Sequence, residues 1–308
     1  MSQPNGRGDH CEPWVGIYTA LVTPFRADLS VDEESLARLI EHQIDGDVDG
    51  VVPCGTTGEA ATLTNKEHAT VIEKIIELVD GRMPVLAGVG GNNTDNVIRL
   101  SRQAKSAGAD GVLAVAPYYN KPTQAGMFQH FSKIADSVSI PLVLYNVPGR
   151  TSSNILPETV LRLAEHGNIE GIKEASGSLP QVMEILAGRP GGFRLLSGED
   201  NLVFPTLCLG GDGVISVVSN QVPGPMSEMV HSALDGEYKR AQKLHFRLLA
   251  LMEANFIETN PIPVKAGLAM MGLLEEYYRL PLVPLAPEHR AQLRKQMEKL
   301  GLLSEQSA

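Results

Sequence analysis

Cysteine, aromatic residues and long apolar runs are all scarce in this sequence. The 308 residues include only three cysteines, Cys11, Cys54 and Cys208, which are far apart and form no C-x-x-C pair. This pattern predicts neither a disulfide framework nor a zinc site, and it favours a reducing compartment. No apolar run reaches the roughly 18 residues that a membrane-spanning helix needs, so we expect no such helix.

Basic residues are outnumbered by acidic ones. The chain has 26 Lys and Arg against 36 Asp and Glu, which gives a formal net charge of -10. The average field of such a protein repels polyanions, so we expect neither nucleic acid nor an anionic membrane as a partner. Residues 1–13 are polar and interrupted by Gly and Pro, without the apolar stretch of a signal peptide. We therefore expect a cytoplasmic protein with a flexible tail over residues 1–13.

Short apolar runs rich in β-branched residues alternate with helix-like stretches along most of the chain. Eight runs predict strands: Gly16–Val22, Gly50–Pro53, Val85–Val89, Gly111–Ala116, Leu142–Asn146, Ile169–Lys173, Phe193–Ser197 and Gly213–Val217. Apolar residues recur at spacings of three and four over Asp32–Asp45, Asn65–Leu78, Thr94–Ala107, Thr123–Ser137, Pro157–Glu165 and Leu179–Leu186. These six stretches predict helices, and we expect Ser30 and Asn65 to cap the first two.

Eight strands that alternate with helices predict a parallel (β/α)8 TIM barrel of the α/β class. An open doubly wound sheet remains the alternative, although no G-x-G-x-x-G follows the first strand and the alternation has no break at its midpoint. Beyond Pro223 only helical patterns follow, over Glu237–Asn255, Ile262–Met271 and Pro287–Leu300. We therefore expect a barrel over residues 14–235 and a C-terminal helical domain over residues 236–308.

Lys173 ends the sixth predicted strand, and the reactive groups of a barrel lie at the C-terminal ends of its strands. An amine held among apolar neighbours loses part of its preference for the charged form. It can then attack a carbonyl group as a nucleophile. The alternative is a structural lysine paired with Glu174 or Glu59.

Strand five ends in Tyr145, and the turn Pro148-Gly149 then leads to Arg150. A phenol beside an amine suits proton transfer, and a guanidinium suits a carboxylate. A packing tyrosine at the rim and a surface loop charge are the alternatives for these two residues.

Hydroxyl groups follow strands two and four. The segment Gly55-Thr-Thr-Gly-Glu59 can bind a carboxylate or transfer protons through Thr56 and Thr57, or it can be an ordinary turn. Strand four is followed by Pro117-Tyr-Tyr-Asn-Lys-Pro122. No histidine pair or carboxylate cluster has the spacing of metal ligands, so we expect no metal.

Six segments together resemble the family of dihydrodipicolinate synthase and N-acetylneuraminate lyase. They are Gly55–Glu59, Pro117–Pro122, Tyr145–Thr151, Gly171–Ser176, Gly213–Ser216 and Asn260–Lys265. They occur in the order of the family, within roughly Gly16 to Leu302. The resemblance implies a lyase with a C-terminal helical domain on its barrel, which forms a covalent imine of pyruvate without a metal or an organic cofactor.

The resemblance also implies a role for each matching residue. Lys173 would form the imine, and Tyr145 would donate and accept protons. Thr57 would hold the pyruvate carboxylate, while Thr56 would link Tyr145 to Tyr119, which comes from a neighbouring subunit in this family.

Two further positions match binding residues of the family. Arg150 would receive the carboxylate of the aldehyde substrate, and the backbone carbonyl of Ile215 would face the lysine amine. The implied reaction condenses pyruvate with L-aspartate 4-semialdehyde to 4-hydroxy-tetrahydrodipicolinate, in lysine and diaminopimelate biosynthesis, and the usual assembly is a homotetramer built as a dimer of dimers.

Two alternatives stay open at this point. The first is a lyase for sialic acid or a 2-keto-3-deoxy sugar acid, although such members typically lack the arginine that matches Arg150. The second is a catalytically silent pyruvate-binding relative, against which the presence of Lys173, Tyr145 and both threonines argues.

The family's inhibitory lysine site is matched by Ala61, His68, Asn92 and Tyr118. The chain departs from it at Ala60, Asn65 and Asn96, where sensitive members carry Ser, His and Glu. An ammonium group that leaves water needs a carboxylate partner, and an amide offers only a neutral acceptor. We therefore expect weak or absent inhibition by lysine, unless Glu59 or a neighbouring acid substitutes.

Overall fold

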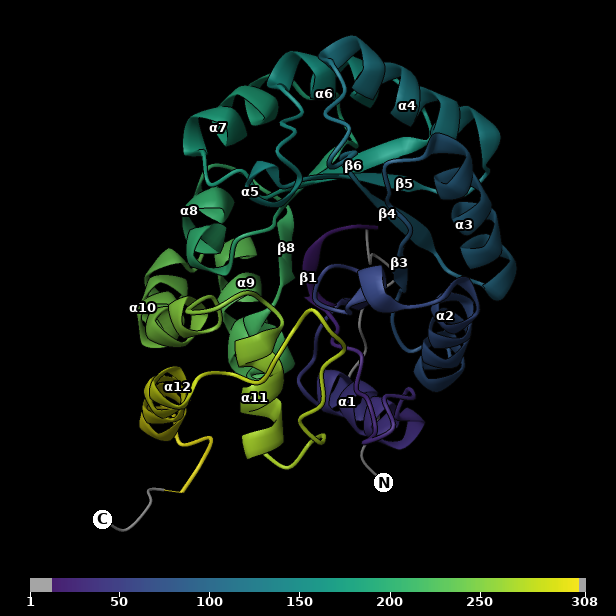
Figure 1. The fold of residues 1–308 in the computed structure, drawn as a ribbon. Coiled ribbons are helices and arrows are strands. Elements are labelled where there is room, and N and C mark those ends of the chain that lie inside the picture. Colours follow the sequence, from purple (N-terminus) through teal and green to yellow (C-terminus); the bar gives the residue numbers. More distant parts are fainter. Residues whose placement is uncertain (1–12, 305–308) are drawn as a thin grey trace, which may run out of the picture.

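The structure, a computed structural model, describes residues 13–304 of the chain. Cys11 and all but the last residue of the expected tail over residues 1–13 lie outside the described residues. Within them, eight strands form one parallel sheet that curves into a barrel surrounded by helices (Figure 1). No helix in this part of the chain has both the length and the apolar character to span a bilayer.

The barrel is closed by its shortest strands. In chain order the strands are β1 Gly16–Ala20, β2 Gly50–Val52, β3 Leu86–Gly88, β4 Gly111–Val115, β5 Leu142–Asn146, β6 Ile169–Glu174, β7 Arg194–Ser197 and β8 Gly213–Ser216. The sheet runs in the order β2-β1-β8-β7-β6-β5-β4-β3. A parallel bridge between Val51 and Val85, with the Gly88 amide donating to the Pro53 carbonyl at 2.9 Å, joins its two ends. The predicted barrel is therefore confirmed, and the open doubly wound sheet is wrong.

Helices cover the outside of the barrel. They are α1 Glu33–Asp45, α2 Asn65–Val79, α3 Thr94–Ala107, α4 Gln124–Ser137, α5 Pro148–Thr151, α6 Pro157–Ala164, α7 Leu179–Gly188, α8 Val203–Cys208 and α9 Pro223–Leu234. Three short 3-10 helices, η1 Ala60–Thr62, η2 Asp200–Leu202 and η3 Val218–Asn220, follow β2, β7 and β8. The six helices predicted from periodicity are all present, whereas α5, α8 and the 3-10 helices are too short to give a periodic signal.

Both predicted N-caps are wrong. Asp32, not Ser30, caps α1, because its carboxylate accepts from the amides of Glu34 and Ser35. Thr64, not Asn65, caps α2, and it forms a capping box in which Glu67 accepts from the Thr64 amide at 2.8 Å. In each case the cap is the residue directly before the helix, whose side chain reaches the amide of the third helical residue.

Side chains that point into the barrel fill it, because successive residues of a strand face opposite sides. Tyr18, Leu86, Leu113 and Ile215 belong to this inner cluster. Trp14 belongs to it as well, and its indole Nε1 donates to Glu170 Oε2 at 2.7 Å before the first strand begins. The packed interior leaves no channel through this cluster, and the C-terminal ends of the strands offer space for a ligand.

The C-terminal part of the chain consists of α10 Tyr238–Ala254, α11 Ile262–Met270 and α12 Pro287–Lys299. Helix α10 packs against α9, and α12 packs against α10 and α11 (Figure 1). An extended segment joins α11 to α12, since no helix or strand lies between Gly272 and Ala286.

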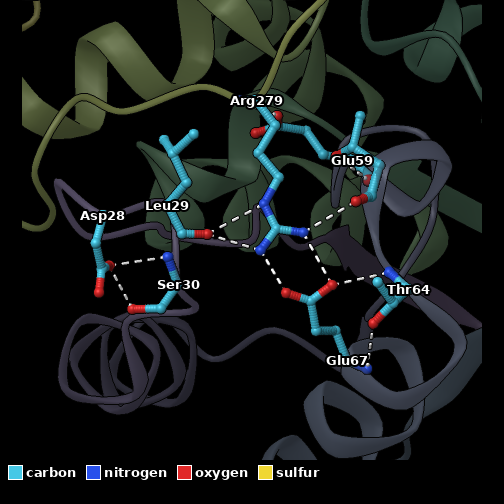
Figure 2. Close-up of polar contacts among 8 residues, drawn as sticks. Asp28, Leu29, Ser30, Glu59, Thr64, Glu67 and Arg279 are labelled. Carbon is cyan, nitrogen blue, oxygen red and sulfur yellow. Dashed lines mark hydrogen bonds and ion pairs between the residues drawn. The ribbon is translucent and has the colours of Figure 1, made fainter.

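Arg279, in that extended segment, contacts two loops at the C-terminal end of the barrel (Figure 2). Its guanidinium binds both carboxylate oxygens of Glu67 at 3.0 and 2.5 Å, and it also donates to the carbonyls of Leu29 and Thr62. The hydrogen bonds from Arg279 lower the pKa of Glu67 to about 2, against the opposing effect of burial. Glu67 therefore stabilises the fold through its charged form.

We expect Glu67→Gln to lower the free energy of unfolding at neutral pH by about 1.5–3 kcal/mol, as for other hydrogen bonds to a charged group. The folded pKa of about 2 lies below the ordinary value of 4.5, so this stabilisation is complete above about pH 4.5 and is lost as the pH falls toward about 2. Denaturant unfolding at about pH 7 and about pH 3.5 measures the difference in free energy of unfolding between the unmodified protein and Glu67→Gln. Glu73→Gln, on the exposed side of the same helix, is the control, and a gap that does not narrow in acid contradicts the ion pair.

Candidate active site

Lys173 lies at the end of β6, between Tyr145 of β5 and Leu196 of β7 in the sheet register. Residues in register on parallel strands face the same side, so Lys173 points into the barrel like its neighbours. Only 6% of the residue is exposed, and Nζ lies 4.4 Å from the centre of the Tyr145 ring. Among residues 13–304 its amine has no hydrogen-bond or ion-pair partner.

The two carboxylates that could have paired with Lys173 bind other groups. Glu59 pairs with Lys265 at 2.6 Å. Glu174 accepts hydrogen bonds from Asn146, Gln181 and the Ser176 amide at 3.0, 3.1 and 2.7 Å. The interpretation of Lys173 as a structural ion-pair residue is therefore wrong, and its amine is left beside the Tyr145 ring.

Gly198, directly after β7, leaves space for the lysine chain. A Cβ atom at this position would lie 3.0 Å from Lys173 Cε and 2.5 Å from Ala175 Cβ. Any side chain here would therefore push against the lysine or its neighbour. Sequence reasoning missed this residue because a lone glycine after a strand gives no sign of what it faces.

Two acidic residues follow Gly198 and were also missed. Burial raises the pKa of Glu199, while the positive charges of Lys173 and Arg150 oppose that shift. Asp200 is fully buried, which raises its pKa, and its Oδ2 accepts from the amides of Val217 and Val218. Their position at a strand end is the signal that could have found them.

A cavity of about 520 Å³ opens at the C-terminal end of the barrel. Thr56, Tyr145 and Arg150 all line it, together with Asn260. Thr57, Lys173 and Ile215 are buried and do not line the cavity, but Thr57 adjoins Thr56 and Lys173 adjoins Tyr145. The structure thus brings six of the seven expected site residues to one end of the barrel.

The C-terminal part of the chain reaches this cavity through Asn260. Its side-chain amide donates to Thr57 Oγ1 at 3.0 Å, and its carbonyl accepts from Arg150 Nη2 at 3.3 Å. Arg150 itself sits in the single turn of α5, which begins with a proline at its first position. One residue from beyond the barrel strands therefore contacts two of the expected binding residues.

Tyr119 is the expected site residue that stays apart. It is 90% exposed, with a backbone φ of 70° that tyrosine adopts infrequently. Its loop is held by hydrogen bonds between neighbouring loops, from Asn92 to the Tyr118 carbonyl and from Asn120 to the Asn92 carbonyl. Within a single chain no hydrogen bond joins Thr56 to Tyr145 or to Tyr119.

No cluster of three or more His, Cys, Asp or Glu side chains suited to a metal ion occurs within residues 13–304.

The family model described as the Dihydrodipicolinate synthetase family matches residues 13–300. The 4-hydroxy-tetrahydrodipicolinate synthase of Syntrophobacter fumaroxidans is 53% identical over 289 residues, which cover 94% of this chain and 99% of that protein. The protein of the same name from Koribacter versatilis is 52% identical over 289 residues, covering 94% and 96%.

Solved structures agree with these relatives. Dihydrodipicolinate synthase from Aquifex aeolicus superposes with a TM-score of 0.93 at 43% identity, covering 95% of this chain and all of that one. The enzyme from Cyanidioschyzon merolae, solved with lysine bound, superposes with a TM-score of 0.92 at 40% identity, covering 94% and 99%. The fold, the order of the motifs and these likenesses agree, and the chain belongs to the dihydrodipicolinate synthetase family.

Proposed function

We propose that this protein is a lyase that condenses pyruvate with L-aspartate 4-semialdehyde to give 4-hydroxy-tetrahydrodipicolinate, in the biosynthesis of diaminopimelate and lysine. The observation that carries the proposal is the buried, unpaired amine of Lys173 beside Tyr145, next to a cavity that Arg150 lines. The name shared by relatives at about half identity supports the same reaction.

The covalent step begins at Lys173. Its neutral amine attacks the C2 carbonyl of pyruvate, and the tetrahedral adduct loses water to form an imine. Tyr145 would give a proton to the departing hydroxyl, and the distance of 4.4 Å between its ring centre and Lys173 Nζ supports this role. The positive imine then makes the adjacent methyl group acidic, and loss of one proton gives an enamine.

The carbon–carbon bond forms when the enamine carbon attacks the aldehyde. The amino group of the second substrate then attacks the imine carbon, which closes the ring and releases Lys173. The protonated imine accepts electrons when the methyl proton is lost and again when the amino group attacks, and in between the enamine donates them to the aldehyde. This chemistry therefore uses the covalent imine in place of a metal or an organic cofactor.

The turn after β2 supplies the site for the pyruvate carboxylate. The amides of Thr56 and Thr57 donate to no other described residue, so both are available to an anion. Thr57 Oγ1 already accepts from Asn260, which orients its hydroxyl proton away from that contact. The Ile215 carbonyl, near the end of β8 and two strands from β6, would face the lysine amine.

Arg150 sets the class of aldehyde in this proposal. Its guanidinium lines the cavity and is held at one nitrogen by the Asn260 carbonyl, which leaves its other donors for a carboxylate. A substrate with a carboxylate beyond its aldehyde therefore fits better than a neutral sugar chain.

The exposed Tyr119 supports an active site that is completed by a second subunit. Burial of this side chain against a second subunit would account for a large aromatic residue that is almost fully exposed and held in a left-handed conformation. We infer a homotetramer, a dimer of dimers, in the cytoplasm, in which Thr56 links Tyr145 to Tyr119 of the neighbouring subunit. A structural relative at 43% identity is described as a monomeric variant, so assembly varies among similar chains.

The groove that matches the family's lysine site is poor in negative charge here. Arg99 donates to Asn65 Oδ1 at 3.0 Å and to Asn96 Oδ1 at 2.6 Å, so a guanidinium occupies the acceptors that an ammonium ligand would need. Glu59 is buried against Lys265 and is not available as a substitute. These contacts support weak or absent inhibition by lysine.

Incubation with pyruvate and borohydride should attach the reduced adduct to Lys173, as read by peptide mapping. Addition of L-aspartate 4-semialdehyde in place of borohydride should give the condensation product, and Lys173→Ala should abolish both results. Labelling at Lys121 or Lys265 would contradict the assignment, and cleavage of N-acetylneuraminate faster than condensation would contradict the reaction.

Arg150→Ala should lower kcat/KM for the aldehyde by roughly ten- to 150-fold, because a hydrogen bond to a charged group contributes about 1.5–3 kcal/mol. Imine formation with pyruvate should change little, which trapping measures separately. Arg247→Ala, an exposed arginine on α10, is the matched control. Equal losses in trapping and in condensation would show that Arg150 does not select the aldehyde.

Mixing inactive Tyr119→Phe and Lys173→Ala proteins under conditions of subunit exchange should restore part of the activity. Some mixed sites then combine an intact Lys173 with an intact Tyr119 from the neighbour. Mass spectrometry of isotope-labelled subunits verifies the exchange. Absence of recovery after verified exchange would place Tyr119 in its own subunit's site or deny it a role.

Turnover measured across a lysine titration should stay close to its uninhibited value at sub-millimolar lysine. Asn96→Glu should strengthen inhibition, since one carboxylate oxygen can accept from Arg99 while the other offers an ammonium ligand a charged acceptor. Strong inhibition of the unmodified protein would show that another acid replaces the missing carboxylate.

A further inference from the structure

Glu59 and Lys265 form an ion pair that is sealed inside the protein. Both side chains have an exposure of 0%, and Lys265 Nζ lies 2.6 Å from Glu59 Oε1. Glu59 ends the turn that contains Thr56 and Thr57, whereas Lys265 belongs to α11, 206 residues later. Neither residue has a part in the reaction described above.

The surroundings of this pair fix its geometry. Lys265 Nζ lies 4.4 Å from the centre of the Phe25 ring and 5.1 Å from that of Tyr278, so aromatic faces surround the ammonium. The second oxygen of Glu59 accepts from the Arg279 amide at 3.5 Å, in the segment shown in Figure 2. Burial lowers the pKa of Lys265, and the charge of Glu59 opposes that shift.

Stability alone does not account for such a pair. Replacing a buried ion pair with apolar side chains of similar size is often neutral or stabilising, because two charges must lose their hydration on burial. What an ion pair adds over apolar contacts is direction, since it holds one oxygen at a defined distance from one nitrogen. We therefore explain the pair by its effect on the backbone: it holds the segment that contains Glu59 in one position.

That backbone is held in an unusual conformation. Cys54 and Glu59, at the two ends of the turn, have φ values of 55° and 53°, in the left-handed region that side chains other than glycine adopt infrequently. Such conformations persist only when surrounding contacts determine them. The Glu59 amide also donates to the Thr56 carbonyl at 3.1 Å, so the position of Glu59 is transmitted directly to Thr56.

We propose that Lys265 is a positioning residue for pyruvate, which acts through Glu59 to hold the Thr56–Thr57 turn in its binding conformation. Asn260, on the same C-terminal segment, holds the turn at its other side through Thr57 Oγ1. This inference rests on the proposed function, in which the turn binds the pyruvate carboxylate. In this proposal α11, which lies outside the barrel strands, supports the pyruvate site through Lys265.

The test is the pyruvate concentration that gives half-maximal borohydride trapping at Lys173. The double variant Glu59→Leu/Lys265→Met keeps the site filled with apolar side chains and removes the directional contact. It should raise the half-saturating concentration at least tenfold, while trapping at saturating pyruvate still goes to completion. Glu59→Gln keeps an oxygen that can accept from Lys265, and it should shift the half-saturating concentration less than threefold.

Arg189→Met is the matched control for a lost ion pair. Arg189 binds Asp212 at the opposite, N-terminal end of the barrel, far from the turn. This variant should lower the unfolding midpoint and leave the half-saturating pyruvate concentration unchanged. Unfolding midpoints of all variants are measured in parallel, and trapping is carried out well below them.

Three results would overturn the positioning role. They are an unchanged half-saturating concentration in the folded double variant, an equal shift in Arg189→Met, and failure of both Glu59 variants to fold, which would assign the pair to stability. Absence of trapping in the unmodified protein is a separate result, because it would refute the proposed imine at Lys173 itself.

Discussion

The contact between β2 and β3 closes the barrel, and the geometry of the site depends on that closure. Once the sheet joins its own edge, the register of all eight strands is fixed, and every strand delivers its C-terminal end to the same rim. Tyr145 then lies beside Lys173 because β5 and β6 are paired at those residues. The inner side chains fill the opposite end, so the open space remains at the rim.

Two buried lysines show how differently the same side chain is treated in one protein. Lys265 loses its hydration entirely, and a carboxylate with two aromatic rings replaces the water. Lys173 is nearly as buried, and its amine lies 4.4 Å from the centre of the Tyr145 ring. Among residues 13–304 no carboxylate forms an ion pair with it. The first environment fixes a charge in place, whereas the second leaves the amine beside an aromatic ring without a paired carboxylate.

The sequence allowed the barrel and much of the rim to be predicted, because both depend on local patterns. Apolar runs gave the strands to within about two residues at each end, and the strand-end rule pointed to Lys173, Tyr145 and Arg150. The hydrogen bond from Asn260 to Thr57 joins residues 203 positions apart, and no periodicity encodes such a contact. The misplaced caps have a local cause, since two residues of suitable type lie within two positions of each other at each helix start and only geometry decides between them.

The ion pair between Glu59 and Lys265 has a consequence for synthesis on the ribosome. The last strand ends at Ser216, so a nascent chain can close its barrel before Asn260 and Lys265 have left the exit tunnel. Until then the carboxylate of Glu59 lacks its partner, and the turn before it lacks the contacts that hold its left-handed residues. In a nascent chain the sheet can therefore be complete before the rim, which is completed only by residues translated after the last strand.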